Sequence, residues 1–417
     1  MLKEMLQNNR FYILKHKDQD VCILELNAMS GKIVSAQVLN VQYMPNLGNP
    51  DIQLLMKWWD HRAIPQNRPE LIELLKQNQC QNAEQYMVKN LALSMTDAYW
   101  ICPDGIDLRW KDVNLYTHHE HTIEFHSVDG MNYSTRNATL GGSLDKRIVY
   151  AADGPELHKS SETLDGQQSI NEAFASLVHK NQGFKNYIAY GLSFDEEHRC
   201  SACICPLFTN EKIEYVPAYE LVSSEKKPNS MSMFEFYIHL CVKHGISEDV
   251  IRKQMDYMIL SDYLMTNTDR HFENFGLLRN SDTMEMIAPA PLFDSGNAMF
   301  YKDAYGKSRV DLAETQVNSF TGFEWKMLSY VSDKAAIDLS KMPDQTFTQR
   351  FYETCGIRKE KARTIAANYQ TKSEMLMDFQ RGISISLYHE KQKEKEVREV
   401  SSYKTLDELL AEINVNK

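Results

Sequence analysis

The stretch that decides the fold is Asp269-Arg-His-Phe-Glu-Asn274, which is followed downstream by Phe293-Asp-Ser-Gly296. An Asp and an Asn five positions apart, with a second Asp further along, are the polar side chains that a phosphoryl-transfer site needs. In such a site the first Asp orients the attacking hydroxyl, while the Asn and the second Asp bind Mg²⁺. The competing interpretation is an ordinary polar loop, because Asp and Asn favour turns for local reasons.

The residues before this stretch predict a helix. Hydrophobic residues recur at roughly helical spacing from 247 to 265, and Ser247 is a suitable N-cap. The hydrophobic face of such a helix would be buried. We therefore expect the helix to carry Asp269 into a loop at its C-terminal end.

The residues after it predict a hairpin. Residues 275–278 form the first expected strand, and 284–293 form the second, which two prolines restrict to an edge or an irregular course. A hairpin would bring Asn274 and Asp294 together although twenty positions separate them. Gly296 would then allow a sharp turn beside a metal-bound phosphate.

This order of elements resembles the HipA-like kinases, a bacterial family distantly related to eukaryotic protein kinases, over roughly residues 130 to 385. The resemblance implies an α+β, bilobal kinase-like fold that uses ATP and Mg²⁺. It also implies that Asp269 is the catalytic base and that Asn274 and Asp294 are the Mg²⁺ ligands.

The resemblance also implies a lysine that contacts the α- and β-phosphates. Leu157-His-Lys159 lies at the corresponding position, so Lys159 is the candidate. A helix is expected from Asn171 to Lys180, and Glu172 at its start would be the acidic partner of Lys159. Such a carboxylate would hold in place an ammonium that is otherwise a mobile point charge.

A glycine-containing loop, Thr139-Leu-Gly-Gly-Ser-Leu-Asp-Lys146, precedes a predicted strand. Gly141 and Gly142 would let backbone N–H groups approach phosphate oxygens, with Ser143 beside them. An ordinary hairpin turn is the alternative. The family carries an autophosphorylated serine in this loop, which makes Ser143 and Thr139 candidate autophosphorylation sites, although the loop sequence departs from the family pattern.

Cysteines are concentrated in a strand that would lead into the hinge between the lobes. By the resemblance, Cys205 and Leu207 there would offer backbone groups to adenine. Cys200 and Cys203 make a metal site conceivable, but structural zinc requires four ligands, so we predict buried thiols. The cluster His118-His-Glu-His121 also raises the question of a metal site, and we predict that it is part of a polar strand instead.

Composition predicts a soluble, cytoplasmic protein. The 417 residues suggest two or three domains, and the eight cysteines are irregularly spaced, as in a reducing compartment. The first ten residues are too polar for a signal peptide, and no run of about 18 apolar residues predicts a membrane span. The net charge of −11 argues against direct binding of nucleic acid.

The predicted domains are an N-terminal α+β domain (1–126), a small kinase-like lobe (127–222) and a helical lobe with C-terminal helices (223–417). The N-terminal domain is expected to be unlike that of HipA itself. Strands are expected between residues 10 and 40, followed by a helix at 51–59. The aromatic residues between 58 and 116 are interpreted as the core of this domain.

The functional hypothesis is an ATP-dependent Ser/Thr protein kinase with a protein substrate and a possible regulatory protein partner. One alternative is a lipid or small-molecule kinase, because the Asp-Arg-His-x-x-Asn motif also resembles the catalytic loop of phosphatidylinositol kinases. The other is a catalytically silent nucleotide-binding regulator or toxin–antitoxin component. Neither direct contact with nucleic acid nor a membrane association is expected.

Overall fold

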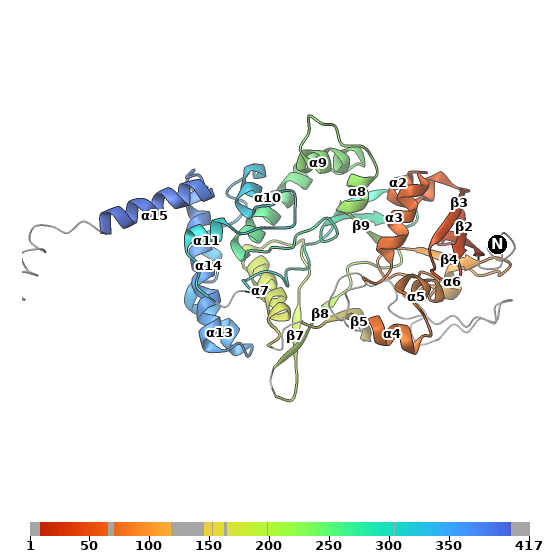
Figure 1. Cartoon of the computed structure of the whole chain (residues 1–417), viewed down its shortest axis with the longest axis horizontal. Helices are drawn as coiled ribbons and strands as arrows, with labels where there is room; N and C mark the ends of the chain where they lie inside the picture. Colours follow the sequence, from red (N-terminus) through yellow and green to blue (C-terminus); the bar gives the residue numbers. More distant parts are fainter. Residues whose placement is uncertain are drawn as a thin grey trace, which may run out of the picture. The chain divides into compact units, whose positions relative to one another are not determined.

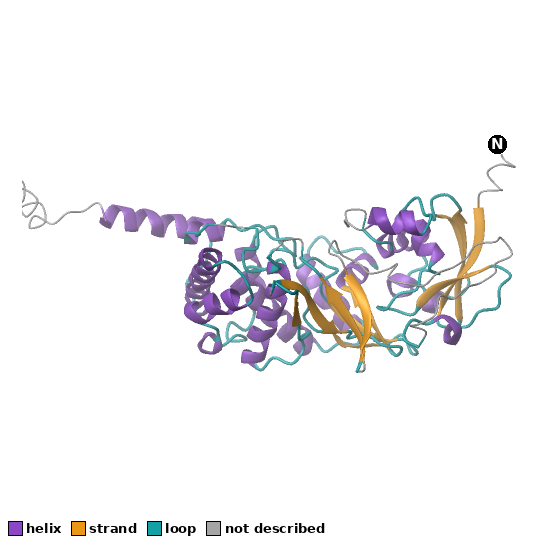
Figure 2. Cartoon of the chain, turned by 90° about the horizontal axis from the view of Figure 1, so that it is seen from below, coloured by secondary structure: helices purple, strands orange, loops and turns teal. Residues whose placement is uncertain are grey.

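Helices and antiparallel strands are mixed along the chain, which confirms the predicted α+β class (Figures 1 and 2). The computed structural model describes residues 9–65, 71–117, 146–151, 153–161, 165–197, 199–302 and 305–401. It divides into two compact units. The first unit contains Met1–Gln254 and Arg270–Gly296, and the second contains Met255–Asp269 and Asn297–Lys417.

The first unit begins with a four-stranded antiparallel sheet in the order β3-β2-β1-β4. The strands predicted between residues 10 and 40 are confirmed. Large aromatic side chains that the sequence suggested as core, including Trp59 and Trp100, are buried in the hydrophobic core of this region. The elements of this region are β1 (Asn9–His16), β2 (Gln19–Asn27), β3 (Ile33–Val38), η1 (Val41–Tyr43), α2 (Pro45–Gly48), α3 (Ile52–Arg62), α4 (Leu71–Gln77), α5 (Ala83–Lys89), β4 (Tyr99–Pro103) and α6 (Trp110–Val113).

A second sheet in the first unit has the order β5-β6-β8-β7 and supports helix α7 (Gln167–Gln182). Its strands are β5 (Lys146–Ala151), β6 (Gly154–Lys159), β7 (Gly191–Phe194) and β8 (Cys200–Pro206). The helix starts four residues earlier than the predicted Asn171, with Gly166 as the N-cap residue at a φ of +69°. Asp165 Oδ1, just before it, accepts the Gln167 N–H at 3.3 Å. Glu172 therefore lies in the second turn of the helix instead of opening it.

The third sheet holds the predicted hairpin. It has the order β11-β10-β9 and consists of β9 (Ile213–Pro217), β10 (Gly276–Asn280) and β11 (Met286–Pro289). The second strand is shorter than the predicted 284–293, since it ends at Pro289, whose nitrogen has no proton to donate. Helices α8 (Ala218–Ser223) and α9 (Met233–Lys243) complete this part of the first unit.

The predicted helix before Asp269 is confirmed as α10 (Glu248–Met265), which begins in the first unit and ends in the second. The second unit is helical. The long stretch predicted from 358 to 390 is two helices, with the break at Gly382, where φ is +86°. The remaining elements are α11 (Arg309–Ala313), α12 (Glu324–Met327), η2 (Leu328–Tyr330), η3 (Leu339–Lys341), α13 (Gln345–Thr354), α14 (Lys359–Gln380) and α15 (Leu387–Ser401).

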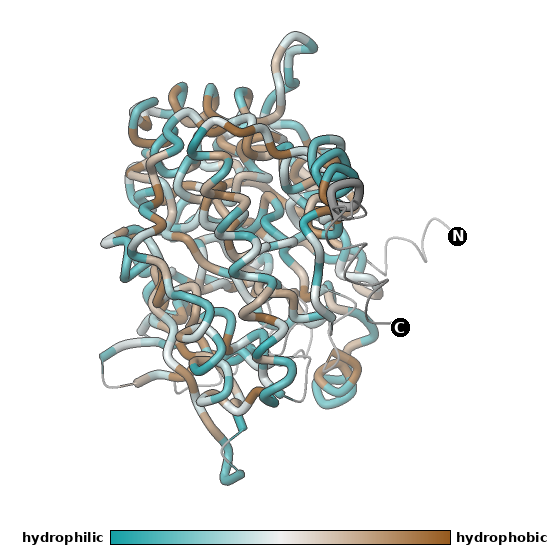
Figure 3. The backbone as a smooth tube through the Cα atoms, turned by 90° about the vertical axis from the view of Figure 1, so that its left-hand side faces the viewer, coloured by the Kyte–Doolittle hydropathy of each residue, from teal (hydrophilic) through white to brown (hydrophobic). Residues whose placement is uncertain are grey.

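Hydrophobic and hydrophilic residues alternate along the chain, as amphipathic elements require (Figure 3). Across the described ranges, every helix is too short or too polar to cross a lipid bilayer.

Candidate active site

Lys159, the last residue of β6, lies between two carboxylates in the first unit. Its Nζ donates to Glu172 Oε1 at 2.8 Å and also to the carboxylate of Asp294. Lys159 and Glu172 are 4% and 1% exposed, whereas the Asp294 side chain is 27% exposed. The three residues therefore form a mostly buried cluster in which only Asp294 offers a carboxylate surface to solvent.

The charges of this cluster stabilise one another. Burial alone would lower the pKa of Lys159, but the carboxylates of Asp294 and Glu172 raise it well above the ordinary value. Burial would likewise raise the pKa of Asp294, but the Lys159 ammonium, with Lys146 and Arg270, lowers it below the ordinary value. Lys159 is therefore a cation and Asp294 an anion at neutral pH.

Helix α7 also holds the backbone that follows Asp294. Glu172 Oε2 accepts the Ser295 N–H at 2.8 Å, and Asn171 Nδ2 donates to the Gly296 carbonyl at 2.8 Å. A Cβ at Gly296 would lie 3.4 Å from Gln168 O and from Glu172 Oε1. Gly296 thus permits a close approach to the helix.

The sharp turn that the sequence placed at glycine occurs at Asp294 instead. Asp294 has a φ of +59°, in the left-handed region that non-glycine residues seldom adopt. Such conformations persist only where surrounding contacts enforce them, and they are concentrated at functional sites. Here the enforcing contacts are those of Lys159 to the side chain and of α7 to the following residues.

Arg270 links the two loops that carry the candidate metal ligands. Its buried guanidinium donates to the Asn274 carbonyl at 3.1 Å, to the Phe293 carbonyl, and to Ser295 Oγ at 3.3 Å. The backbones of Asn274 and Phe293 and the side chain of Ser295 are thereby held by one guanidinium, as the hairpin prediction requires. The sequence alone predicted no role for Arg270.

Asp269 belongs to the second unit, where two amides orient it. Asn297 Nδ2 donates to Asp269 Oδ2 at 2.8 Å, and Asn318 Nδ2 approaches Oδ1 at 3.5 Å. Asp269 N–H in turn donates to Asn267 Oδ1 at 3.3 Å. Sequence reasoning missed both amide donors. Only the position of Asn297, directly after the Asp-x-Gly element, offered a signal.

The comparisons with known proteins identify the architecture. No protein-family model and no curated protein match the sequence. A structure of Shewanella oneidensis HipA, in a toxin–antitoxin complex with HipB and operator DNA, is similar with a TM-score of 0.54 at 13% identity. The similarity covers 91% of this chain and 99% of that chain. This chain has a HipA-like fold.

The proinflammatory kinase CtkA of Helicobacter pylori is also similar, with a TM-score of 0.41 at 17% identity, over 58% of this chain and 95% of that one. The HipA similarity is wider than the stretch of roughly 130 to 385 that the sequence indicated, so it extends into the N-terminal region. At these identities the comparison concerns the fold and leaves the chemistry to the residues.

The residues of the HipA-like fold fit a Mg²⁺ ion bound together with nucleotide phosphates. The two predicted ligands, Asn274 and Asp294, carry an amide oxygen and an ionised carboxylate, which are donor groups of the kind that Mg²⁺ takes. The described residues include no group of three or more His, Cys, Asp or Glu side chains placed to hold a metal. Mg²⁺ commonly takes only one or two protein ligands and completes its coordination with phosphate and water oxygens.

Of the other residues predicted to contact the nucleotide, the structure describes Cys205 and Leu207. Cys205 is buried in β8, and burial raises the pKa of its thiol to about 12. The N–H of Leu207 donates to the Pro155 carbonyl at 3.2 Å, which engages it within the sheet. Cys200 and Cys203 are buried thiols too, as predicted. Outside the described residues lie Thr139, Gly141, Gly142, Ser143 and the cluster at 118–121.

Proposed function

We propose that this protein is an ATP-dependent kinase that phosphorylates a Ser or Thr hydroxyl of a protein substrate. The observation that carries the proposal is the Lys159 ammonium held between Glu172 and Asp294 on a HipA-like fold. A cation that is buried this deeply needs anionic partners, and a nucleotide phosphate can share it with the more exposed Asp294. The Arg270 contacts, which join the loops of Asn274 and Asp294, support the same interpretation.

The proposed reaction is in-line transfer of the γ-phosphoryl group. The bond between the γ-phosphorus and the β-phosphate oxygen breaks, a bond to the acceptor hydroxyl oxygen forms, and ADP leaves. Asp269, oriented by Asn297 and Asn318, accepts the hydroxyl proton. Lys159 neutralises the non-transferred phosphates while Glu172 holds it in place. Mg²⁺, bound by Asn274 and Asp294, would neutralise charge on the β- and γ-phosphates.

We further propose a regulatory protein partner, by analogy with the HipA structure, which contains HipB and operator DNA. The net charge of −11 favours protein contacts over direct binding of DNA by this chain. Autophosphorylation at Ser143 or Thr139, nucleotide contacts by Gly141, Gly142, Cys205 and Leu207, and a cytoplasmic location belong to the same proposal.

The test is to incubate the full-length protein with Mg²⁺ and γ-labelled ATP, with and without a cell lysate. Asp294→Ala is the inactive variant, and Asp249→Ala is the matched control, because Asp249 is an exposed carboxylate on the surface of α10. We expect labelled protein with the wild type and with Asp249→Ala, and none with Asp294→Ala. Label that is extracted into organic solvent would indicate a lipid kinase. A nucleotide-dependent rise in melting temperature without any transfer would indicate a silent regulator.

A further inference from the structure

Lys372 of α14 is a fully buried charged residue in the second unit. It is 0% exposed, and its Nζ donates to Glu324 Oε2 at 2.6 Å. The ammonium also lies over the ring of Tyr263, 3.2 Å from the centre of the ring. Glu324 is 4% exposed, and its second oxygen, Oε1, has no hydrogen-bond partner among the described residues. Lys372 therefore connects its own helix to α10, which carries Tyr263, and to the first residue of α12.

The stability of the protein alone does not account for such a pair. Burial raises the pKa of Glu324 and lowers the pKa of Lys372, so the surroundings oppose both charges. The loss of hydration offsets much of the attraction between two buried ions, and a well-packed hydrophobic pair is often at least as stable. A hydrophobic pair lacks a hydrogen bond with a fixed direction. The ion pair thus supplies a defined position for Glu324 beside α14.

Glu324 lies at the foot of a hairpin. Its N–H donates to the Thr315 carbonyl at 3.2 Å. Immediately beyond these two residues, Gln316 and Phe323 form an antiparallel bridge. Residues 316–323 are called the 316–323 hairpin below. Because Glu324 closes the hairpin, a contact that holds Glu324 also holds the foot of the hairpin.

The same hairpin contacts the loop that carries the proposed base. The Asn318 N–H donates to the carbonyl of Thr268, which directly precedes Asp269, at 2.9 Å. The Asn318 side chain approaches Asp269 Oδ1 at 3.5 Å. On the other side of the loop, Tyr263 of α10 lies six positions before Asp269 and contacts Lys372. Lys372 is therefore linked both to the helix that leads to Asp269 and to the hairpin that supports it.

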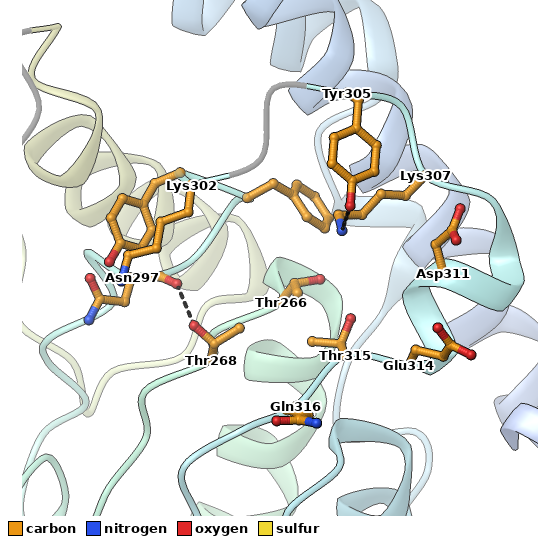
Figure 4. Close-up of a pocket in the computed structure, with 12 residues that line it drawn as sticks. Thr266, Thr268, Asn297, Lys302, Tyr305, Lys307, Asp311, Glu314, Thr315 and Gln316 are labelled. Carbon is orange, nitrogen blue, oxygen red and sulfur yellow. Dashed lines mark hydrogen bonds between the residues drawn. The ribbon is translucent and has the colours of Figure 1, made fainter.

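Packing alone does not fix the foot of the hairpin, because a cavity of about 450 Å³ lies beside it. Figure 4 shows Thr315 and Gln316 together with Thr266 and Thr268 from the end of α10, and all four residues line this cavity. In a close-packed interior, neighbouring atoms hold a segment on every side, whereas a segment beside a cavity lacks such neighbours on that side. Its position depends more strongly on the directional contacts that remain.

We propose that Lys372 is a positioning residue for Asp269, because by holding Glu324 it keeps the 316–323 hairpin against residues 268 and 269. The inference rests on the proposed kinase function and adds to it a residue that acts at a distance from the reacting atoms. When Lys372 is removed, the Asn318 amide moves more freely, and the Asp269 carboxylate is aligned with the acceptor hydroxyl for less of the time. Small losses of alignment are costly in catalysis.

The experiment makes two measurements on the full-length protein. Hydrogen–deuterium exchange with mass spectrometry follows the backbone N–H groups of residues 316–324, and label transfer from Mg-ATP gives kcat and KM for ATP. One variant is Lys372→Met. The second is the double variant Lys372→Met with Glu324→Met, which leaves neither charge of the pair buried and keeps the proposal testable if the single variant folds poorly.

The control is Asp256→Asn, which also removes a buried carboxylate from the second unit. Asp256 is 3% exposed on α10 and accepts the Ser332 N–H at 2.9 Å, so its contacts lie outside the 316–323 hairpin. This variant should lower the melting temperature, as the loss of a buried contact does. It should leave both the exchange of residues 316–324 and kcat as they are in the wild type.

We expect both Lys372 variants to speed the exchange of residues 316–324 at least about tenfold, because the foot of the hairpin opens more often. They should lower kcat roughly 10- to 100-fold and leave KM for ATP unchanged, since Lys159 and its partners belong to the first unit. Exchange at the wild-type rate, or a wild-type kcat, in the folded double variant would overturn the inference. Faster exchange in the variants, with no label transfer by the wild type, would count against the kinase proposal alone.

Discussion

The roles of the two carboxylates around Lys159 differ because their surroundings differ. Glu172 is fully engaged, since one oxygen accepts from Lys159 and the other accepts the Ser295 N–H. Asp294 is more exposed, and its carboxylate can turn to a metal ion while Lys159 keeps one anionic partner. Glu172 is therefore a positioning residue, and Asp294 is the residue with direct contact to the phosphate-bound metal in our proposal.

Replacing Glu172 with Gln should impair use of the nucleotide. The variant keeps the size of the side chain but leaves Lys159 with one carboxylate, so the ammonium is less firmly held. We expect kcat/KM for ATP to fall roughly 10- to 100-fold, which corresponds to about 1.4 to 2.8 kcal/mol. Steady-state kinetics would measure this. Glu197→Gln, at an exposed position, is the control, and equal values for the two variants would contradict the assigned role.

At the scale of single residues, the sequence predicted the side chains whose spacing is local. Asp269 and Asn274 are five positions apart, and a hairpin carries the chain on to Asp294. Arg270 and Asn297 escaped prediction because their roles depend on hydrogen bonds to distant segments, and Arg and Asn are ordinary loop residues by composition. The functional roles of all these residues remain predictions.

Helix α7, which supplies Glu172 to the Lys159 cluster, also carries a buried histidine that makes the stability of the protein depend on pH. His179 lies in the last turn of α7 and is 4% exposed. Burial, helped by the nearby Arg270 guanidinium, lowers its pKa from 6.5 to about 3. The folded protein thus keeps His179 neutral at a pH where the unfolded chain would protonate it.

A histidine whose pKa is lowered by folding weakens the folded state in acid. Below pH 6.5 the unfolded chain binds a proton that the folded chain does not, so stability falls with pH until about pH 3. Between pH 6.5 and 5 this group should cost about 2 kcal/mol. His179→Gln should lose less stability over that interval, as measured by urea denaturation at both pH values. Equal losses in variant and wild type would show that His179 is not the responsible group.

Gly276, at the start of β10, sets the position of the loop that carries Asn274. A Cβ at this residue would lie 2.2 Å from Val216 O and 2.8 Å from Pro217 Cα, both backbone atoms of β9. Gly276→Ala should therefore destabilise the protein by at least about 2 kcal/mol. Gly191→Ala is the control, because the nearest atom there is 3.9 Å away. Chemical denaturation compares the two, and similar midpoints would contradict the proposed close packing.

Among the elements, those with strong periodicity or clear caps were predicted well. α10 and the N-terminal strands follow their hydrophobic patterns. The start of α7 was missed because an Asp and a Gly at 165 and 166 do not differ locally from a turn, and β11 was predicted too long. Beyond Pro289, Ala290 N–H still donates to the Gly276 carbonyl at 2.9 Å, but Leu292 forms a parallel bridge with Tyr187. The sequence does not show this change of partner.

Within the first unit, the N-terminal sheet is tied to the β9–β10 strands by a buried ionic network. Glu214 of β9 accepts from His16 Nε2 at 2.7 Å, from the Ala98 N–H at 2.7 Å and from Arg279 Nε at 2.8 Å. All three side chains are almost fully buried. The N-terminal region is thereby anchored to the strand that leads to the candidate site.

Glu214→Gln should destabilise these two regions together. Removing the carboxylate charge leaves the buried Arg279 guanidinium without the carboxylate that it pairs with, a change that typically costs about 3 to 5 kcal/mol. We expect one cooperative unfolding transition at a lower denaturant concentration, seen both by tryptophan fluorescence and by circular dichroism. Four of the five tryptophans lie in the N-terminal core, so fluorescence reports mainly on that region. Separate transitions for the two signals would contradict this anchoring.

At the scale of the molecule, the sequence predicted the fold class and its HipA-like character from one short motif. The division at residues 126 and 222 stays a prediction. The His16–Glu214–Arg279 network could not be predicted from the sequence. His16 and Glu214 are 198 positions apart, and none of the three residues belongs to a motif.

The most direct test of the account compares Asp269→Asn with the wild type in two measurements on one preparation: binding of Mg-ATP, followed by thermal shift, and transfer of the γ-phosphoryl group to protein. The account predicts that Asp269→Asn binds Mg-ATP as the wild type does and transfers at least about 1000-fold more slowly, because the proton acceptor is lost. Transfer by Asp269→Asn at the wild-type rate would contradict it.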